Sequence, residues 1–338
     1  MKLMEDTVDI FLTWVDGDDQ EWNKMRQKYA VYNNEIQARV NGIQRYRNWN
    51  NLKYIFRGIE LYMPWVRKVY FVTCGQIPDF LNVKNEKLVI INHEDYIPKK
   101  YLPTFNSNTI EMNLFRIKGI AQNVLLFNDD TFVIEPIPKS YFIKNGKPCD
   151  EAIERIIGRP HLIYSKNMIN NAWIINKYFD KKKVKKENWI KWYNVAYGKD
   201  IIRNIIMNYF NMFEGLRNPH EPFLLRKDIC EKIWEYEPEL LDIASNNKFR
   251  NESDVTQYVI RYWNIFEGNF IPRKHKGKAF TVSEQNYKEI ADAIRTKKFP
   301  LVSVDENADI PLEKFEIVRD EINSAFESVM PQKSSFEK

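Results

Sequence analysis

The sequence is poor in the features that mark secreted, zinc-binding and membrane-spanning proteins. It has only three cysteines, Cys74, Cys149 and Cys230, and no C-x-x-C spacing. A disulfide framework or a zinc site is therefore not expected, and a reducing cytoplasm is the simpler inference. No apolar run approaches the roughly 20 residues that a transmembrane helix needs, and no early segment has the pattern of a secretion signal. These absences predict a cytoplasmic protein, or at most one peripheral to a membrane.

The charge of the chain is also modest, with a formal net charge of +5 at pH 7. Because acidic and basic residues are interleaved, this excess does not by itself argue for nucleic acid. Anionic substrates such as phosphates, or anionic lipid headgroups, fit equally well. Aromatic residues are abundant at 14%, which suits sugar rings, nucleobases or a membrane interface, but also a large aromatic core.

Short apolar segments alternate with helical patterns through the first part of the chain. The expected strands are residues 8–15, 68–74, 87–92 and 124–127, with 131–134 continuing the last one after a break. The expected helices are residues 21–39, 50–62 and 108–120. This alternation predicts a doubly wound, Rossmann-like α/β fold with a mostly parallel sheet. Residues that follow the strands should then gather at one edge, where such sheets bind ligands.

The C-terminal half is expected to be a helical elaboration of that sheet. Its expected helices are residues 188–213, 221–236, 253–265, 283–296 and 312–326. Because no repeat or low-complexity linker interrupts the chain, we expect one catalytic domain over residues 1–328. It would comprise a sheet core to about residue 150, a helical insertion at about 160–215, and a helical part at about 216–328 that completes the active site. Residues 329–338 are expected to form a flexible tail.

The densest chemistry follows the apolar run 124–127, where Asn128, Asp129 and Asp130 stand in succession. Adjacent carboxylates at a strand tip suit a divalent cation such as Mg²⁺, which prefers carboxylate oxygens and completes its shell with water and phosphates. The alternative is an Asx turn that caps the strand end, and Asn128 alone would supply it. The doubled aspartate favours the metal site.

A second acidic cluster, Asp16, Asp18 and Asp19, surrounds Gly17 at the end of the first strand. Glycine would let a phosphate or a base approach the backbone closely. We expect Asp16 to face the cleft and one of the later aspartates to cap the next helix.

Histidine and arginine supply the remaining candidates. His220, between two prolines in the segment NPHEP, is a rigid platform for a general base. Arg45 and Arg116 belong to cleft-forming segments and suit phosphate oxygens. Arg250 precedes Ser253, the expected N-cap of an aromatic helix, where anions are favoured. Any one of these residues is more often structural, so their association carries the argument.

Two basic segments each allow two interpretations. The run Lys181–Lys186 is either a solvated face or a patch that touches anionic lipid or a lipid-linked acceptor. The segment 273–278, which includes Lys274, is either a solvated turn or a loop that closes over a diphosphate.

Taken together, these motifs resemble the Stealth family of sugar-phosphate transferases. WVDGDD at 14–19 resembles its first conserved region, the stretch from RYR at 45–47 to NDD at 128–130 its second, NPHEPFLLRKDI at 218–229 its third, and FRNESDVTQYVIRYW at 249–263 its fourth. Each motif alone is weak, but four in family order make a specific match. One departure is NWN at 48–50, where many members have acidic residues.

The resemblance implies a bacterial enzyme of capsular or exopolysaccharide biosynthesis. It would transfer a hexose or N-acetylhexosamine 1-phosphate from a UDP-sugar to a hydroxyl of a glycan or lipid-linked oligosaccharide, release UMP, and require Mg²⁺ or Mn²⁺. Such an enzyme would be cytoplasmic, or peripheral at the inner face of the plasma membrane. Two alternatives stay open: a metal-dependent glycosyltransferase that releases UDP, and a non-catalytic glycan-binding protein.

In that chemistry, Asp130, His220 and Arg250 are the expected catalytic residues, with His220 as the candidate base. Asp129 and Asp130 would hold the metal. Asp254 would either join the metal shell or orient His220, and the sequence does not decide between these roles. The residues expected to bind substrate are Trp14, Asp16, Gly17, Arg45, Asn106, Arg116, Asp254, Gln257 and Lys274.

Overall fold

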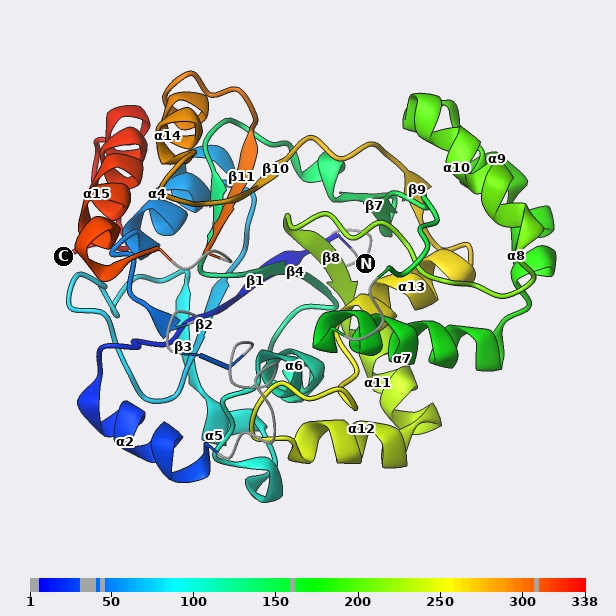
Figure 1. Cartoon of the computed structure of the whole chain (residues 1–338), viewed down its shortest axis with the longest axis horizontal. Helices are drawn as coiled ribbons and strands as arrows, with labels where there is room; N and C mark the ends of the chain where they lie inside the picture. The colour runs from blue at the N-terminus through cyan, green and yellow to red at the C-terminus, as the bar shows by residue number, and fades with distance from the viewer. Residues whose placement is uncertain (1–5, 31–40, 43–45, 159–161, 307–309) are drawn as a thin grey trace.

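The computed structural model describes residues 6–30, 41–42, 46–158, 162–306 and 310–338. Its centre is a five-stranded sheet in the order β3-β2-β1-β4-β8 (Figure 1). The strands are β1 (Val8–Thr13), β2 (Val69–Thr73), β3 (Leu88–Asn92), β4 (Asn123–Phe127) and β8 (Phe223–Arg226). The first four are parallel and β8 is antiparallel to β4. The mostly parallel α/β sheet predicted from the sequence is therefore confirmed.

The strand order places a topological switch point between β1 and β4. The chain builds β2 and β3 on one side of β1, then crosses to add β4 on the other side. Because β1 and β4 are parallel and in register from Val8 to Leu12, the residues that follow both strands lie at the same edge. This crevice is where open α/β sheets bind ligands.

Alternate side chains of the strands feed two hydrophobic cores, one on each face of the sheet. Ile10 of β1 and Leu125 of β4 belong to one core, whereas Phe11 and Leu126 belong to the other. The first core is covered by α4 (Leu52–Tyr62), α14 (Tyr287–Arg295) and α15 (Leu312–Val329). The second is covered by α6 (Ser107–Met112), α7 (Ile163–Tyr178), α11 (Lys227–Tyr236) and α13 (Tyr258–Phe266).

The remaining elements connect or border these layers. The helices are α2 (Gln20–Tyr29), α5 (His93–Tyr96), α8 (Lys181–Glu187), α9 (Trp189–Trp192), α10 (Ile201–Ile206) and α12 (Pro238–Asn246). The 3₁₀ turns are η2 (Lys99–Tyr101), η3 (Leu114–Arg116), η4 (Lys139–Tyr141), η5 (Val195–Asp200) and η6 (Met207–Tyr209). One small sheet joins β6 (Ile143–Lys144), β7 (Lys147–Asp150) and β9 (Ile271–Pro272).

Residues 131–134 do not continue β4, contrary to the prediction. They form β5 (Thr131–Val133), which pairs antiparallel with β11 (Leu301–Asp305) in a separate sheet that also contains β10 (Lys278–Thr281). The turn at Asp129 and Asp130 redirects the chain out of the central sheet. The acidic residues therefore stand at a junction between two sheets.

Three predicted helices are wrong in extent or type. The helix expected at 108–120 stops at Met112, where the Asn113 side chain bonds the carbonyl of Thr109. The long helix expected at 188–213 is broken into α9, η5, α10 and η6, and Gly198 has a positive φ of 56° within the break. The segment expected as a helix from residue 221 begins instead with strand β8.

Two other boundaries also shift. The aromatic helix begins at Tyr258, with Gln257 as its N-cap, so Ser253 does not cap it. The expected helix at 21–39 ends at Tyr29, and the rest of its span beyond Ala30 lies outside the described residues. Asp19 does cap that helix, since its side chain accepts hydrogen bonds from the backbone of Glu21 and Trp22.

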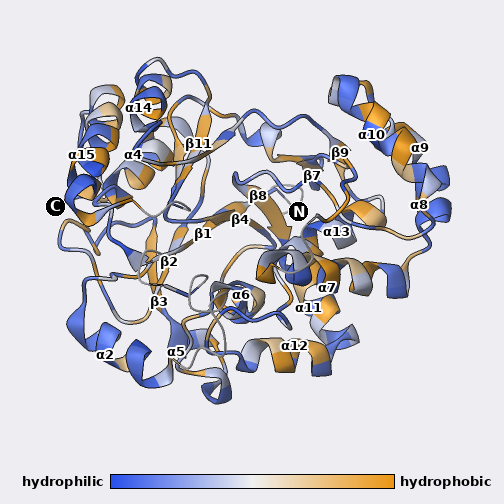
Figure 2. Ribbon diagram, in the orientation of Figure 1, coloured by the Kyte–Doolittle hydropathy of each residue, from blue (hydrophilic) through white to orange (hydrophobic). Residues whose placement is uncertain are grey.

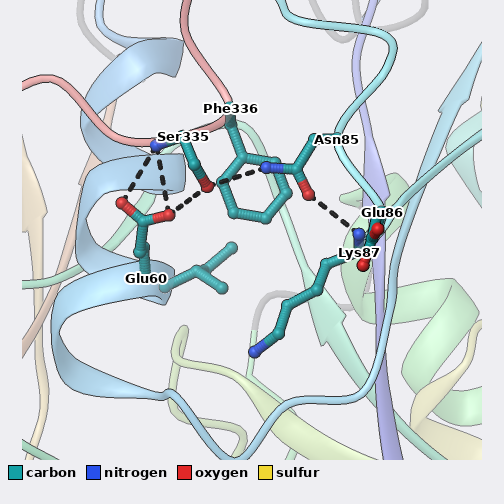
Figure 3. Close-up of a pocket in the computed structure, with 7 residues that line it drawn as sticks. Glu60, Asn85, Glu86, Lys87, Ser335 and Phe336 are labelled. Atoms are coloured by element: carbon teal, nitrogen blue, oxygen red, sulfur yellow. Dashed lines mark hydrogen bonds between the residues drawn. The ribbon is translucent and has the colours of Figure 1, made fainter.

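The C-terminal residues are packed against the molecule, whereas the sequence predicted a flexible tail. Phe336 is buried, and Glu337 pairs with Arg57 of α4 at 2.8 Å. The backbone of Ser335 donates to the Glu60 carboxylate at 3.0 Å, and Asn85 Nδ2 donates to Ser335 Oγ at 2.8 Å (Figure 3). These contacts border a surface pocket of about 310 Å³ that none of the candidate site residues lines.

Among the described residues, none of the helices has the length and apolar content that crossing a bilayer requires.

Candidate active site

The central pair of the candidate site is Asp130 and His220, which are 90 residues apart in sequence. His220 Nε2 lies 2.9 Å from Asp130 Oδ2. The two meet because β8 runs antiparallel to β4, with Phe223 opposite Leu126. The residues that precede β8 therefore lie at the same sheet edge as those that follow β4. The sequence indicated each residue separately, and the antiparallel strand brings them together.

The electrostatics of the pair are strongly perturbed. The charge of Asp130, partly opposed by burial, raises the pKa of His220 to about 9. Burial alone would raise the pKa of Asp130, but the attraction and hydrogen bond of His220 bring it below its ordinary value. At neutral pH the two groups therefore form an imidazolium–carboxylate pair. Perturbed groups of this kind are typical of catalytic clefts.

Asp129 differs from its neighbour in its protonation. The Asp129 side chain is exposed at the turn after β4, but the surrounding protein atoms still reduce its hydration. This desolvation, followed by repulsion from Asp130 and Asp305, raises the pKa of Asp129 to about 7. A cluster of carboxylates in which one pKa is raised would stabilise a bound positive charge.

Two hydroxyls join the ends of the Asp130–His220 pair into a ring. Thr131 Oγ1 lies 3.0 Å from Asp130 Oδ1 and 3.2 Å from the hydroxyl of Ser303. Ser303 Oγ in turn donates to the backbone carbonyl of His220. The ring fixes both the carboxylate and the peptide that carries the imidazole. Sequence reasoning missed Ser303, because nothing in residues 301–305 signals that this strand reaches the site.

Arg250 approaches the same region from a loop before α13. Its Nη2 donates to Ser107 Oγ at 3.0 Å, and its backbone exchanges hydrogen bonds with the Asn41 side chain at 3.2 and 3.3 Å. Its charge influences the pKa values of His220, Asp129 and Glu111. The charge of Arg250 therefore acts on the Asp130–His220 pair, while its hydrogen bonds go to Ser107 and Asn41.

Glu111 of α6 is a candidate site residue that the sequence analysis did not select. Burial, against the attraction of Arg250 and His220, raises its pKa to about 7. Its side chain is buried, and Oε2 has no hydrogen-bond partner within the described parts of the chain. A buried, unpartnered carboxylate oxygen near two cations is suited to a ligand or a proton. Its only sequence signal was a carboxylate among apolar residues in NTIEM.

Asp254 and Asn106, both predicted to bind substrate, contact each other. Asp254 accepts hydrogen bonds at 2.7–2.9 Å from the amides of Asn106, Asn108 and Asn247 and from the backbone of Asn251. Among the hydrogen bonds of the described residues, none joins Asp254 to His220. Asp254 is therefore the centre of an amide cluster that fixes the loop carrying Arg250.

The turn after β1 packs against other segments of the protein. The Gln76 side chain accepts from the Asp16 backbone at 2.8 Å, and Trp14 stacks on Phe71. A Cβ on Gly17 would lie 1.6 Å from the carbonyl oxygen of Tyr46. Glycine is thus required by the close approach of Tyr46, not by open space for a phosphate as the sequence suggested.

The remaining predicted substrate residues lie in different settings. Gln257 lines a small cleft at the site, with residues Leu126, Asn128, Thr131, His220, Glu221, Phe223 and Tyr258. Arg116 bonds Asn113 and stacks on Phe115 and Trp234, so aromatic rings rather than the Asp130–His220 pair surround its guanidinium. Lys274 is exposed between β9 and β10, and Arg45 lies outside the described residues.

The residues after β4 fit a hard divalent cation in chemistry, although the protein alone does not form a complete cage. Within the described residues, no group of three or more His, Cys, Asp or Glu side chains is arranged to hold a metal ion. Asp129 and Asp130 supply adjacent carboxylate oxygens. The pKa of Asp129 is raised first by burial and then by repulsion from neighbouring carboxylates, and a cation would relieve that repulsion. Mg²⁺ is commonly held by one or two carboxylates plus substrate phosphates.

Comparison with known proteins identifies the family of the chain. Residues 45–150 match the model for "Stealth protein CR2, conserved region 2". Over 340 residues the chain is 39% identical to the capsular polysaccharide phosphotransferase WcwK of Streptococcus pneumoniae, covering 100% of both chains. It is 33% identical to an exopolysaccharide phosphotransferase of Lactiplantibacillus plantarum, covering 98% of this chain and 96% of that protein. It is 30% identical to the receptor polysaccharide phosphotransferase WefC of Streptococcus oralis, covering 98% and 99%. The chain therefore belongs to the Stealth family, alongside these capsular and exopolysaccharide phosphotransferases.

Proposed function

We propose that this chain transfers a hexose or N-acetylhexosamine 1-phosphate from a UDP-sugar to a hydroxyl of a glycan acceptor, in capsular or exopolysaccharide biosynthesis. The products are a phosphodiester and UMP. The observation that carries the proposal is the Asp130–His220 pair, with Arg250 nearby, at the switch point of the sheet. The names of the relatives support the reaction class.

In the proposed reaction the acceptor oxygen attacks the phosphorus that bears the sugar. The bond from that phosphorus to the bridging oxygen breaks, and UMP leaves with the electron pair. The bond between the sugar C1 and its oxygen stays intact, so the anomeric configuration is kept. Such phosphoryl transfers depend chiefly on positioning and on stabilising charge at the phosphoryl oxygens.

His220 is suited to handle the acceptor proton. With Nε2–H directed at Asp130, the second ring nitrogen of neutral His220 can take the proton from the attacking hydroxyl. Asp130 stabilises the resulting imidazolium, consistent with a His220 pKa of about 9. The same pKa means that His220 is largely protonated at neutral pH before substrate binds. In that state it contributes positive charge beside the donor diphosphate, and it must lose its proton before it can accept one from the acceptor hydroxyl.

Arg250 and a divalent cation would neutralise the donor. Arg250 would bond the phosphoryl oxygens, whose charge grows in the transition state. Asp129 and Asp130 would hold Mg²⁺ or Mn²⁺, which supplies electrostatic stabilisation of the diphosphate when bound.

The test is a panel of UDP-sugars with Mg²⁺ or Mn²⁺, candidate glycan acceptors, and separation of UMP from UDP. We expect acceptor-dependent release of UMP with at least one donor, and loss of turnover when EDTA removes the cation. Release of UDP without UMP, in the absence of phosphatases, would instead identify a glycosyltransferase. Glycan binding that EDTA leaves unchanged, with no turnover of any donor, would identify a binding protein.

A further inference from the structure

The segment from α8 to η6 presents apolar side chains to solvent. On α10, Ile202, Ile205 and Ile206 are 59%, 56% and 61% exposed, at the i, i+3 and i+4 positions of one helical face. Tyr209 continues the same stripe and is 89% exposed. A surface helix normally turns such a stripe toward the core. This helix does the opposite, and its apolar colouring is visible at the edge of the molecule in Figure 2.

The buried side chain of α10 is the polar Asn204, which lies beside the partly buried Ile201, and its contacts fix the orientation of the helix. Asn204 is fully buried, and its amide donates to the carbonyls of Ala152 at 2.7 Å and Trp192 at 2.6 Å. Its side-chain oxygen accepts from the backbone of Glu154 at 2.8 Å. Rotating the helix to bury its isoleucines would remove these buried hydrogen bonds, which is costly.

A buried ion cluster holds α8 in the same way. Lys181 lies 2.7 Å from Glu154, and Lys185 pairs with the other oxygen of that carboxylate. Both lysines are buried. The sequence allowed the run Lys181–Lys186 to be either a solvated face or a lipid-binding patch. In the structure, Lys181 and Lys185 are buried and belong to neither. The candidate surface is instead formed by the exposed residues of α8, by α9 and α10, and by the turns beside them.

We call residues 182–212 the arm, and apolar exposure continues along it. Trp189 and Ile190 of α9 are each 61% exposed, Val195 is 88% exposed, and Met212 is 56% exposed. Figure 1 shows α8, α9 and α10 running together along one edge of the molecule. Scattered apolar side chains need no explanation on a surface, but a gathering of this kind marks an interaction site.

The exposed charges of the arm are mostly positive. Exposed cations are Lys182, Lys183, Lys186, Lys199 and Arg203, whereas Glu187 is the exposed acidic residue within 182–212, a span that the structure describes in full. Asp200, partly buried, is neutralised by Arg217 at 3.0 Å. A second copy of the chain would bring like charges together on this face. An anionic surface would complement it.

We propose that the arm is a docking element that lies on an anionic bilayer surface. Its isoleucines would enter the boundary between headgroups and acyl chains, as the apolar face of an interfacial helix does. Trp189 and Tyr209 have the amphipathic rings that favour this depth. Lys199 and Arg203 would remain among the phosphate groups of the lipids.

The arm is joined directly to the catalytic loop. Arg217, three residues before His220, bonds Asp200 of the arm and also Glu151, at 2.6 Å from Nε to the carboxylate. Docking would therefore hold the site close to the lipid surface, which suits an acceptor carried on a lipid. That extension rests on the proposed function, whereas binding to vesicles does not.

The test is flotation of the purified full chain with vesicles of phosphatidylcholine alone or mixed with phosphatidylglycerol. We expect the chain to float with the anionic vesicles and much less with the neutral ones. The variant Ile202→Ser/Ile206→Ser should lower the partition coefficient at least ~10-fold, because it removes two inserted side chains. The matched control is Ile243→Ser/Ile317→Ser, whose isoleucines are 56% and 55% exposed on α12 and α15.

Charge reversal provides two further variants that do not alter the apolar face. Lys199→Glu and Arg203→Glu should each weaken binding to anionic vesicles by about fivefold or more. Circular dichroism checks that each variant is folded. Failure of the wild-type chain to float, or equal flotation of the Ile202→Ser/Ile206→Ser variant and the control, overturns the proposal. It is also overturned if sedimentation shows a dimer that only the Ile202→Ser/Ile206→Ser variant dissociates, because the occupant is then a second copy.

Discussion

At the scale of single residues, the Asp130 side chain contacts His220 and Thr131, and a third residue supports both of them. Asp130 faces His220 at 2.9 Å, accepts from Thr131 at 3.0 Å, and is linked through Thr131 and Ser303 back to the carbonyl of His220. Thr131 and Ser303 offer two hydroxyl hydrogens for the three contacts of this chain. One contact therefore has no hydrogen at any one time. With Thr131 donating to Asp130 and Ser303 donating to the His220 carbonyl, it is the contact between the two hydroxyls. Such support holds the imidazole in the orientation that proton transfer needs.

The first prediction concerns this pair. Asp130→Asn and His220→Ala should each lower the rate of UMP release at least ~100-fold, because each removes one side of the charge and proton-handling unit. The double variant should be little worse than either single variant, since the two residues act together. Turnover with the donor found in the UDP-sugar panel measures this, and thermal unfolding verifies the fold. Asp292→Asn, whose side chain is 76% exposed, is the control; near wild-type turnover by Asp130→Asn would refute the assignment.

Sequence reasoning selected Asp130 from the end of an expected strand, and His220 and Arg250 from the expected starts of two helices. The structure instead places strand β8 after His220 and begins the second helix at Tyr258.

Sequence reasoning did not select Glu111 or Ser303. Glu111 is a carboxylate on a buried helical face, and its chemistry depends on Arg250 and His220 lying nearby, which no local pattern encodes. Ser303 reaches the site through antiparallel pairing of β11 with β5, across about 170 residues of chain.

At the scale of elements, the parallel strands were predictable and β8 was not. The four parallel strands are mostly apolar runs bounded by turn residues, as buried strands of a parallel sheet should be. The run FLLR of β8 is equally apolar but short, and a short apolar run does not distinguish strand from buried helix. Pairing with β4 decides the matter. The same antiparallel pairing brings His220 to Asp130. The wrongly predicted helix at residue 221 and the geometry of the site therefore have one cause.

The packing of the C-terminal segment was also not predicted, because it depends on contacts with a distant part of the chain. The second prediction concerns this segment. Its polar sequence suggests fraying, but Arg57 binds Glu337 through two hydrogen bonds of 2.8 and 2.9 Å, and both side chains are nearly fully buried. Glu337→Gln should lower the free energy of unfolding by about 2 kcal/mol, because Arg57 loses a charged hydrogen-bond partner but keeps its ion pair with Glu327 at 2.9 Å. Urea denaturation measures this change. Turnover at low temperature should be retained, since none of the candidate site residues lines the pocket beside the tail.

The control for that experiment is Glu316→Gln on the exposed side of α15, which should change stability by less than about 0.5 kcal/mol. If Glu337→Gln unfolds at the same urea concentration as the control variant, the tail is not held by this ion pair.

At the scale of the whole molecule, the site forms only where distant parts of the chain meet. The segment at 106–108, the loop at 247–254 and Asn41 converge on one another, and Arg250 is held between them. The sequence predicted that Asn106 and the Arg250–Asp254 segment share a cleft, but not how they are joined, and it did not select Asn41. Asp254 joins them by accepting four hydrogen bonds at full burial. Its role is therefore to position Arg250, through the backbone of the loop that they share.

The third prediction tests that role with Asp254→Asn. The new amide would direct two hydrogens toward donors that now point at a carboxylate, so the free energy of unfolding should fall by about 2 kcal/mol or more. Because the loop then shifts, kcat should fall about tenfold even at temperatures where the variant remains folded. Asp242→Asn, with a side chain 39% exposed on α12, is the matched control and should keep both stability and kcat near wild type. A variant that loses stability but retains wild-type kcat would show that Asp254 supports the fold without placing Arg250 for catalysis.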